Sequence, residues 1–236
     1  MAEPLVLVPG MMCDARVFEA QISALSAGRI VVISPPIKGE TVEVMAEHIL
    51  QNAPERFALA GLSLGGIVAL EILRRAPDRV CRLALISTSA LSETPSQAAE
   101  REPQIVGAKA GRLGEVMQEV MKPEYLAHGP QRVTVLNLMQ DMALEIGADI
   151  FVRQSRALQR RPDQQKTLRT IHTPTYVICG SYDCLTPLQR QEFMATLIPY
   201  AEFRVIEEAG HLPTVEAPEA TTEIMREWLS APVVLR

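Results

Sequence analysis

One serine of this sequence lies between two glycines, in the run Gly61-Leu62-Ser63-Leu64-Gly65, which fits the pattern G-x-S-x-G. A serine in this pattern is a candidate nucleophile where it occupies a tight turn between a strand and a helix. Side chains beside the serine would collide with neighbouring backbone in such a turn, so glycine is needed at both flanking positions. The alternative is that Ser63 only caps the helix that follows it.

A serine nucleophile needs a general base and a third residue that orients the base. Asp183 closely follows the apolar run 175–179, and His211 closely follows the run 202–206. Both residues should therefore lie at the carboxyl ends of strands, in the chain order serine, acid, histidine. We expect Gly210 to make the histidine loop flexible, so that the imidazole can reach the serine. A turn-forming aspartate and a surface-turn histidine are the alternatives.

Other positions are weaker candidates for these two roles. The competing position for the acid, directly after residues 82–86, holds hydroxyl side chains and no carboxylate. Three further histidines lie within a predicted helix, within a helical insertion or before a strand: His48, His128 and His172. We interpret these histidines as solvated or helix-capping residues.

Backbone N–H groups near the serine could stabilise the oxyanion of a tetrahedral intermediate. One donor should be Leu64, directly after the nucleophile, and the other should come from the loop that follows the first strand. By position Met11 is the expected second donor, with Met12 as the alternative. Met12, Cys13 and Leu212 are expected to contact the substrate, although Cys13 is more simply a small filler residue.

These residues require a frame of alternating strands and helices. The predicted strands are apolar throughout, as expected for parallel strands with both faces buried, and helical crossovers separate them. The strands are residues 4–8, 30–33, 57–60, 82–86, 175–179 and 202–206. The helices are residues 15–27, 41–53 with Thr41 as N-cap, 64–76, 187–197 with Thr186-Pro187 as cap and first turn, and 217–229. The pattern predicts an α/β fold with a doubly wound, mainly parallel sheet of about six strands.

The segment from 93 to 165 contains helical patterns and no convincing strand. The predicted helices are 95–110, 112–121, 130–145 and 147–160. We therefore predict a core of residues 1–92 and 166–236, with residues 93–165 as a helical lid over the carboxyl edge of the sheet. The lid methionines could pack its helices together or line a flexible substrate pocket: Met117, Met121, Met139 and Met142.

Composition limits the classes of function. The chain has 236 residues, 47% of them hydrophobic and 22% charged, which suits one domain with an insertion. Its net charge is −5 and it has no basic stripe, so nucleic acid and anionic membrane surfaces are not expected partners. The four cysteines form no CxxC pair, which favours free, buried thiols in a reducing compartment over disulfides or zinc.

The sequence also bears on location. The stretch MAEPLVLVPG has no basic region and a short apolar run, so we expect neither a signal peptide nor an anchor. No apolar run approaches the roughly 20 residues of a membrane span. The prediction is a cytoplasmic monomer or small homo-oligomer that acts on a small molecule.

Four segments together resemble the α/β-hydrolase superfamily, in its small carboxylesterase and C–C hydrolase-like branch. They are LVLVPGM (5–11), GLSLGG (61–66), GSYDCLTP (180–187) and AGHLPTVEAPE (209–219). The resemblance implies Ser63 as nucleophile, His211 as general base and acid, and Asp183 as the residue that orients His211. It also implies ester hydrolysis through an acyl-enzyme without metal or organic cofactor.

The chain departs from its relatives at two places. Pro9-Gly10 replaces a common His-Gly pair, which alters the entrance while leaving the backbone donor. Few residues precede the first predicted strand, so we expect the N-terminal hairpin of many relatives to be trimmed here. A serine at the nucleophile position argues against the dehalogenase and epoxide-hydrolase branches, which attack through a carboxylate.

Several functions fit the same residues. Lactones, thioesters and C–C bonds of vinylogous diketones could be cleaved by the same triad. A lyase or cofactor-free perhydrolase, and a non-catalytic ligand receptor on the same fold, are alternatives of other classes.

Overall fold

The computed structural model describes residues 2–232, so Met1 and the end of the predicted core segment, 233–236, lie outside the described residues. Within the described residues the strands form one six-stranded sheet, and every neighbouring pair is parallel. Its order is β2-β1-β3-β4-β5-β6. The strands are β1 (Leu5–Val8), β2 (Val31–Ile33), β3 (Phe57–Leu62), β4 (Val80–Ile86), β5 (Thr175–Gly180) and β6 (Glu202–Ile206). The prediction of a parallel sheet of about six strands is confirmed.

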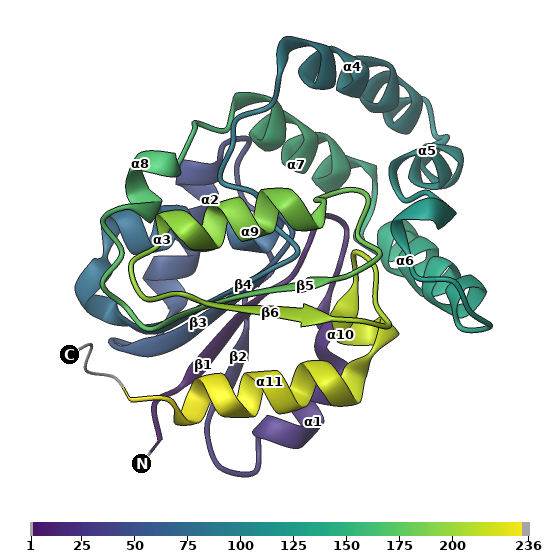
Figure 1. Cartoon of the computed structure of the whole chain (residues 1–236). Helices are drawn as coiled ribbons and strands as arrows, with labels where there is room; N and C mark the ends of the chain where they lie inside the picture. Colours follow the sequence, from purple (N-terminus) through teal and green to yellow (C-terminus); the bar gives the residue numbers. More distant parts are fainter. Residues whose placement is uncertain (1, 233–236) are drawn as a thin grey trace.

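Helices cover both faces of the sheet (Figure 1). One face packs against α1 (Glu19–Leu25) and α11 (Pro218–Ser230), and the other against α2 (Val42–Asn52), α3 (Leu64–Arg75) and α9 (Leu188–Leu197). Successive residues of β1 face the two sides of the sheet in turn. Leu5 and Leu7 pack on the side of α1 and α11, and Val6 and Val8 pack on the side of α2, α3 and α9. This double burial explains why the strand is apolar throughout.

The chain between β4 and β5 is helical. It contains α4 (Pro95–Lys109), α5 (Leu113–Val120), the 3₁₀ turn η3 (Pro123–Tyr125), α6 (Arg132–Ile146), α7 (Ala148–Arg160) and the short α8 (Gln165–Leu168). In Figure 1, α4 to α7 lie together beyond one end of the strands. No helix within residues 2–232 is both long and apolar enough to cross a membrane.

The sheet order creates a crevice where the direction of winding reverses. β1 pairs with β2 on one side and with β3 on the other, and Val8 lies beside Gly61 in the register. The loops after β1 and β3 therefore leave the sheet side by side at its carboxyl edge. Open α/β sheets bind their ligands at such a point.

Some element boundaries differ from the prediction. The predicted helix 15–27 divides into a 3₁₀ turn, η1 (Ala15–Phe18), and α1, because the Asp14 carboxylate accepts the N–H of Arg16 and tightens the first turn. Thr41 caps α2 as predicted, by accepting the N–H of Val44. The short elements η2 (Pro77–Arg79), η3, α8 and α10 (Pro213–Glu216) were not predicted, since segments of three or four residues show no helical period.

Candidate active site

Ser63 occupies a strained turn between β3 and α3. Its φ of 52° lies in the left-handed region, which a residue other than glycine adopts only when its surroundings impose it. The Ser63 N–H donates to the carbonyl of Ile86 at 2.9 Å, and the Thr88 hydroxyl donates to the Ser63 carbonyl at 2.7 Å. Hydrogen bonds on both sides of the residue hold the turn in this conformation.

The flanking glycines are sterically required. A Cβ on Gly61 would lie 2.3 Å from the carbonyl oxygen of Gly65, and a Cβ on Gly65 would lie 1.9 Å from that of Val8. This agrees with the predicted need for glycine on both sides. The Ser63 side chain makes no capping hydrogen bond to α3, so the alternative that it only caps the helix is wrong.

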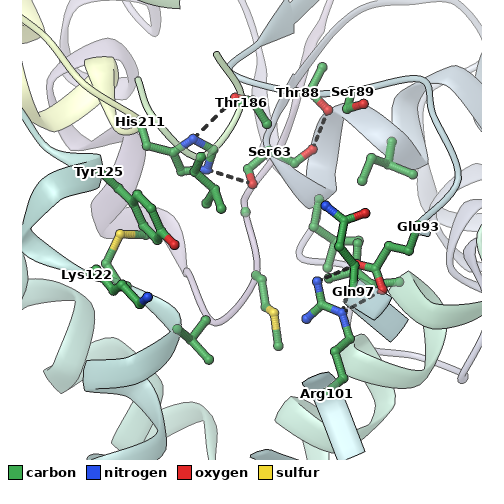
Figure 2. Close-up of a pocket in the computed structure, with 18 of the residues that line it drawn as sticks. Ser63, Thr88, Ser89, Glu93, Gln97, Arg101, Lys122, Tyr125, Thr186 and His211 are labelled. Atoms are coloured by element: carbon green, nitrogen blue, oxygen red, sulfur yellow. Dashed lines mark hydrogen bonds and ion pairs between the residues drawn. The ribbon is translucent and has the colours of Figure 1, made fainter. Parts of the chain in front are cut away.

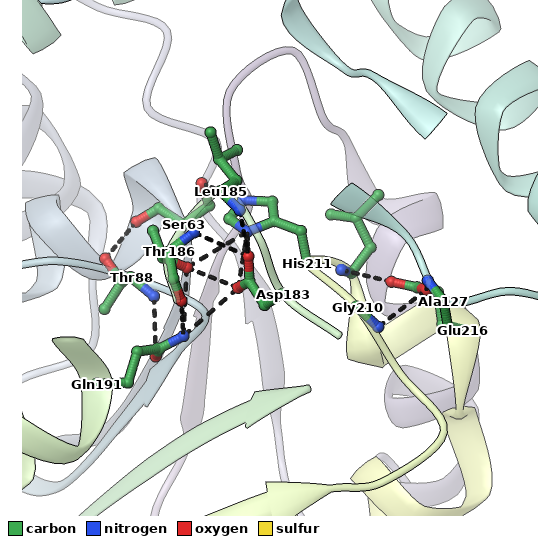
Figure 3. A network of polar contacts seen from close by, with 11 residues as sticks. Ser63, Thr88, Ala127, Asp183, Leu185, Thr186, Gln191, Gly210, His211 and Glu216 are labelled. Atoms are coloured by element: carbon green, nitrogen blue, oxygen red, sulfur yellow. Dashed lines mark hydrogen bonds and ion pairs between the residues drawn. The ribbon is translucent and has the colours of Figure 1, made fainter. Parts of the chain in front are cut away.

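The structure brings Ser63, His211 and Asp183 together from the ends of three strands (Figure 3). His211 Nε2 lies 3.0 Å from Ser63 Oγ, and His211 Nδ1 lies 3.1 and 3.0 Å from the two Asp183 carboxylate oxygens. An ionised carboxylate only accepts hydrogen bonds, so Nδ1 carries the imidazole proton and Nε2 is free to accept from the serine. This is the arrangement that activates a serine hydroxyl.

Asp183 is enclosed by donors, and its side chain is fully buried. One oxygen accepts the N–H groups of Leu185 and Thr186 at 2.9 and 2.8 Å, and the other accepts the Thr186 hydroxyl at 2.6 Å. Burial alone would raise the pKa of Asp183, but the charge of His211 and the hydrogen bonds from His211 and Thr186 outweigh it and hold the pKa below its usual range. The carboxylate therefore stays ionised beside the imidazole.

The predicted cap of α9 is wrong. The helix begins at Leu188, and Pro187 is its N-cap residue without a side-chain capping bond. The Thr186 hydroxyl instead donates to the Asp183 carboxylate at 2.6 Å, a charge-assisted hydrogen bond. Gln191 of α9 supports the same cluster: its Nε2 donates to the Thr186 carbonyl at 2.9 Å and its Oε1 accepts the Thr88 N–H at 3.3 Å.

The loop that carries His211 is tightly packed, contrary to the expectation of a flexible glycine. A Cβ on Gly210 would lie 2.4 Å from the Tyr125 carbonyl oxygen, and the His211 N–H donates to that same oxygen at 2.7 Å. The buried carboxylate of Glu216 accepts the N–H groups of Gly210, Leu212 and Ala127 at 3.0, 2.8 and 2.7 Å (Figure 3). Gly210 therefore permits close approach between this loop and residues 125–127.

Two backbone N–H groups beside Ser63 have no partner within the described part of the chain: those of Leu64 and Met11. The N–H of Met12 donates to Oε1 of Gln154 at 2.9 Å, so Met12 is not available as the alternative donor. Gln154 belongs to α7, is 1% exposed, and also donates to the Pro36 carbonyl at 3.1 Å. It holds Met12 at a φ of 54°, another left-handed residue, and so fixes the loop that contains Met11.

A cavity of about 610 Å³ opens over Ser63, within the size range of small-molecule sites. Figure 2 shows Ser63 and His211 at one end of it, with Tyr125 and Lys122 on one wall and Glu93, Gln97 and Arg101 on the opposite one. Of the methionines in the predicted lid, Met117, Met121 and Met139 line the cavity, and Met142 does not. Both interpretations of the methionines therefore hold for part of the set, because Met142 is fully buried among the helices.

Two of the expected substrate contacts line this cavity and one does not. Cys13 and Leu212 are lining residues, whereas Met12 is fully buried in a separate core cluster with α5 and α7 residues. The expectation for Met12 is wrong because its left-handed backbone turns the side chain into that core. Burial, with a smaller contribution from the Asp14 charge, raises the pKa of Cys13 to about 12, so its thiol is a poor nucleophile.

The remaining candidates lie apart from the triad or show no ligand set. His128 and His172 are exposed and His48 is half-buried. All four cysteines are free, but Cys184 is exposed, which corrects the expectation of buried thiols. Within residues 2–232, no group of three or more His, Cys, Asp or Glu side chains could hold a metal ion.

The sheet order, the strained serine turn and the hydrogen-bonded Ser-His-Asp set define an α/β fold with a nucleophile elbow at its topological switch point. Residues 5–224 match the Alpha/beta hydrolase family, and the chain belongs to that family.

Similar proteins include enzymes named for ester hydrolysis. A pimeloyl-[acyl-carrier protein] methyl ester esterase of Aromatoleum aromaticum is 29% identical over 240 residues, covering 91% of this chain and 93% of the relative. A thermophilic esterase from Thermogutta terrifontis, solved with malate bound, is 29% identical with a TM-score of 0.87, covering 97% and 90% of the two chains. The enol-lactonase of Burkholderia xenovorans LB400 is 22% identical with a TM-score of 0.86, covering 98% and 92%, and shares the fold.

Proposed function

We propose that this protein is a serine hydrolase that cleaves a carboxylic ester of a small molecule through an acyl-enzyme intermediate. The observation that carries the proposal is the 3.0 Å contact between Ser63 Oγ and His211 Nε2, with His211 Nδ1 held by a buried, ionised Asp183. The similarity to ester-cleaving relatives, at 29% identity over most of both chains, supports the same class of substrate.

The proposed reaction proceeds in two halves. Ser63 Oγ attacks the ester carbonyl carbon while His211 Nε2 takes the hydroxyl proton, and the N–H groups of Leu64 and Met11 stabilise the oxyanion. The tetrahedral intermediate collapses as His211 gives its proton to the leaving alcohol, which produces the acyl-enzyme. His211 then deprotonates a water molecule that attacks the acyl carbon, and the acid is released as Ser63 regains its proton.

Residues 93–165 would act as the lid of this site, with residues 1–92 and 166–236 as the catalytic core. Support comes from the cavity, whose walls combine core residues such as Leu64 with insertion residues such as Met117 and Met139. The lid would therefore determine which substrates fit the cavity, while the triad residues at the carboxyl edge of the sheet carry out the reaction.

The test is hydrolysis of a short-chain p-nitrophenyl ester by the wild type and by Ser63→Ala. We expect the wild type to turn over and the variant to lose about 10⁴-fold or more in kcat. A wild type that is inactive on a broad panel of esters, thioesters and lactones would refute the proposal.

Covalent labelling separates an enzyme from a ligand receptor on the same fold. A fluorophosphonate should label the wild type at Ser63, and it should not label Ser63→Ala. Incorporation of ¹⁸O from labelled water into the released acid would distinguish hydrolysis from a lyase or perhydrolase reaction.

A further inference from the structure

A group of charged residues lines the same cavity and takes no part in the proposed reaction. Glu93 lies in the segment after β4, Arg101 on α4, Arg161 directly after α7 and Arg190 on α9, and all four are lining residues. Among these four residues three positive charges accompany one negative charge, and Glu100, Glu119 and Lys122 also line the cavity. Figure 2 shows Glu93 and Arg101 on the cavity wall below Ser63.

Arg101 pairs with the Glu93 carboxylate. Its Nε lies 2.8 and 3.0 Å from the two Glu93 oxygens, and its Nη2 lies 2.6 Å from one of them. The Glu93 side chain is 4% exposed and that of Arg101 is 19% exposed. This bidentate pair has the preferred geometry of a guanidinium with a carboxylate, so Arg101 already neutralises the charge of Glu93.

Arg161 is a second buried cation, and no carboxylate lies within hydrogen-bond distance of it in the described structure. Its side chain is 13% exposed, its Nε donates to the Leu91 carbonyl at 2.9 Å, and its Nη1 lies 3.8 Å from Glu93, beyond hydrogen-bond distance. Burial, together with the charges of Arg101 and Arg190, lowers the pKa of Arg161 to about 10 against the attraction of Glu93. A buried charge without full compensation is costly, and an anion in the cavity would relieve that cost.

Arg190 adds a third guanidinium without an acidic partner. Within the described residues, no carboxylate lies within 4.0 Å of it, and its side chain is exposed. The other acids that line the cavity, Glu100 and Glu119, are exposed to solvent, and neither forms an ion pair with Arg161 or Arg190 in the described structure. The cavity lining therefore offers a bound molecule the guanidinium groups of Arg161, directly after α7, and of Arg190, on α9.

We propose that Arg161 and Arg190 bind a carboxylate of the substrate, so that the preferred substrate is an ester that carries a second, free carboxylate. Half-esters of dicarboxylic acids are the simplest members of this class. Guanidinium groups suit it because they present paired donors to a planar carboxylate. This inference rests on the proposed ester hydrolysis and specifies, in addition, that the substrate carries a negative charge.

The test compares matched esters. Monomethyl adipate carries the free carboxylate, whereas dimethyl adipate has the same scissile bond and chain without the charge. The wild type should prefer the half-ester in kcat/KM by about 10- to 100-fold, the size of one or two charge-assisted hydrogen bonds. Arg161→Met should lose most of this preference, measured within the variant as the ratio of kcat/KM for the half-ester to kcat/KM for the diester.

Arg160→Met is the matched control. Arg160 precedes Arg161 on the chain, is 54% exposed, and pairs with Glu40 on the surface at 3.4 Å. It should keep the wild-type preference. Should Arg161→Met fail to fold, Arg190→Met tests the same carboxylate at an exposed position and should also reduce the preference.

A binding measurement separates this inference from the proposed function. Ser63→Ala should bind adipate by calorimetry, and addition of Arg161→Met or Arg190→Met should weaken that binding about 10-fold or more. An active wild type with equal kcat/KM for half-ester and diester, or adipate affinity unchanged in both arginine variants, overturns the carboxylate site and leaves ester hydrolysis standing. Adipate binding that depends on the arginines, with no ester cleaved, supports the site and overturns the hydrolase.

Discussion

Gln154 joins the proposed lid to the loop that contains Met11, the proposed second oxyanion donor, and its replacement tests whether that loop must be held by contacts from α7. The side chain accepts the Met12 N–H at 2.9 Å and donates to the Pro36 carbonyl at 3.1 Å. Gln154→Met keeps the length of the side chain and removes both hydrogen bonds. Gln154 does not line the cavity, so ground-state contacts with the substrate should be unchanged.

The expected magnitudes follow from these two contacts. A buried N–H left without a partner costs about 1–3 kcal/mol, so the free energy of unfolding should fall by about 2 kcal/mol or more. In a chain of this size that corresponds to a lower Tm by roughly 4–8 °C. Removing one oxyanion donor costs about 10²–10³ in kcat. Met11 keeps its N–H but loses its fixed direction, so we expect a smaller loss, about 10-fold.

The assay separates this role from simple stability. Steady-state kinetics on a neutral ester should show kcat reduced with KM within about twofold, and a trifluoromethyl ketone, which forms an anionic adduct with serine, should bind about 10-fold more weakly. Gln154→Glu keeps an acceptor for Met12 and should recover part of kcat. Gln159→Met is the control, since Gln159 lies on the same helix and bonds Ala98 and Glu102 instead. A lower Tm with unchanged kcat and unchanged ketone affinity would refute the reasoning.

Two further predictions concern the histidine loop and the acid. Gly210→Ala places a Cβ 2.4 Å from the Tyr125 carbonyl oxygen, so both Tm and kcat should fall. Gly28→Ala is the control, since nothing lies within 4 Å of its Cβ, and it should change neither. A wild-type Tm for Gly210→Ala in thermal denaturation would contradict the prediction. Asp183→Asn should reduce kcat by about 10⁴-fold, the cost of losing the orienting carboxylate in a triad. Because the folded-state pKa of Asp183 is lowered, its stabilising contribution is present above the ordinary value of about 4 and is lost as the pH falls through the folded value. The Tm advantage of the wild type over Asp183→Asn should therefore shrink in acid, and an advantage that stays constant down to pH 2 would contradict the prediction.

The sequence sufficed for the frame because its signals are local. Short, largely apolar runs separated by helical patterns predicted the strands, and the ends of three of them predicted where Ser63, Asp183 and His211 would lie. Strand β3 was predicted two residues short, at 57–60, because glycine reads as a strand end. In the structure Gly61 continues the strand beside Leu85, where only a residue without a side chain can pass the backbone of Gly65.

The parts that the sequence did not predict depend on contacts between distant segments. Thr186, Gln191 and Glu216 hold the acid and the histidine loop, but a threonine, a glutamine and a glutamate near a strand end are ordinary residues in any chain. Gln154 lies 142 positions from Met12, and its spacing within α7 is that of any buried helix position. One sequence signal for Glu216 was available, because it follows the G-H-L-P run by only three residues. In the structure the short helix α10 turns its carboxylate back toward the histidine loop, where it accepts the Leu212 N–H.

A glycine can make a loop flexible, or it can let two backbone segments approach closely. Which of these applies to Gly210 bears on how the site works. A flexible Gly210 would let the imidazole move between positions, and His211 would then lose entropy each time it reached the serine. The structure instead pairs the His211 N–H with Tyr125, which lies within residues 93–165, and the Gly210 N–H with Glu216 of the core, so contacts from both parts fix the backbone that carries the imidazole. Met11 is set by the lid as well, through Gln154 and Met12. In the proposed mechanism the base and one oxyanion donor both depend on contacts with residues 93–165. A change in this proposed lid that alters the substrate should therefore also alter kcat, because the same hydrogen bonds affect both properties.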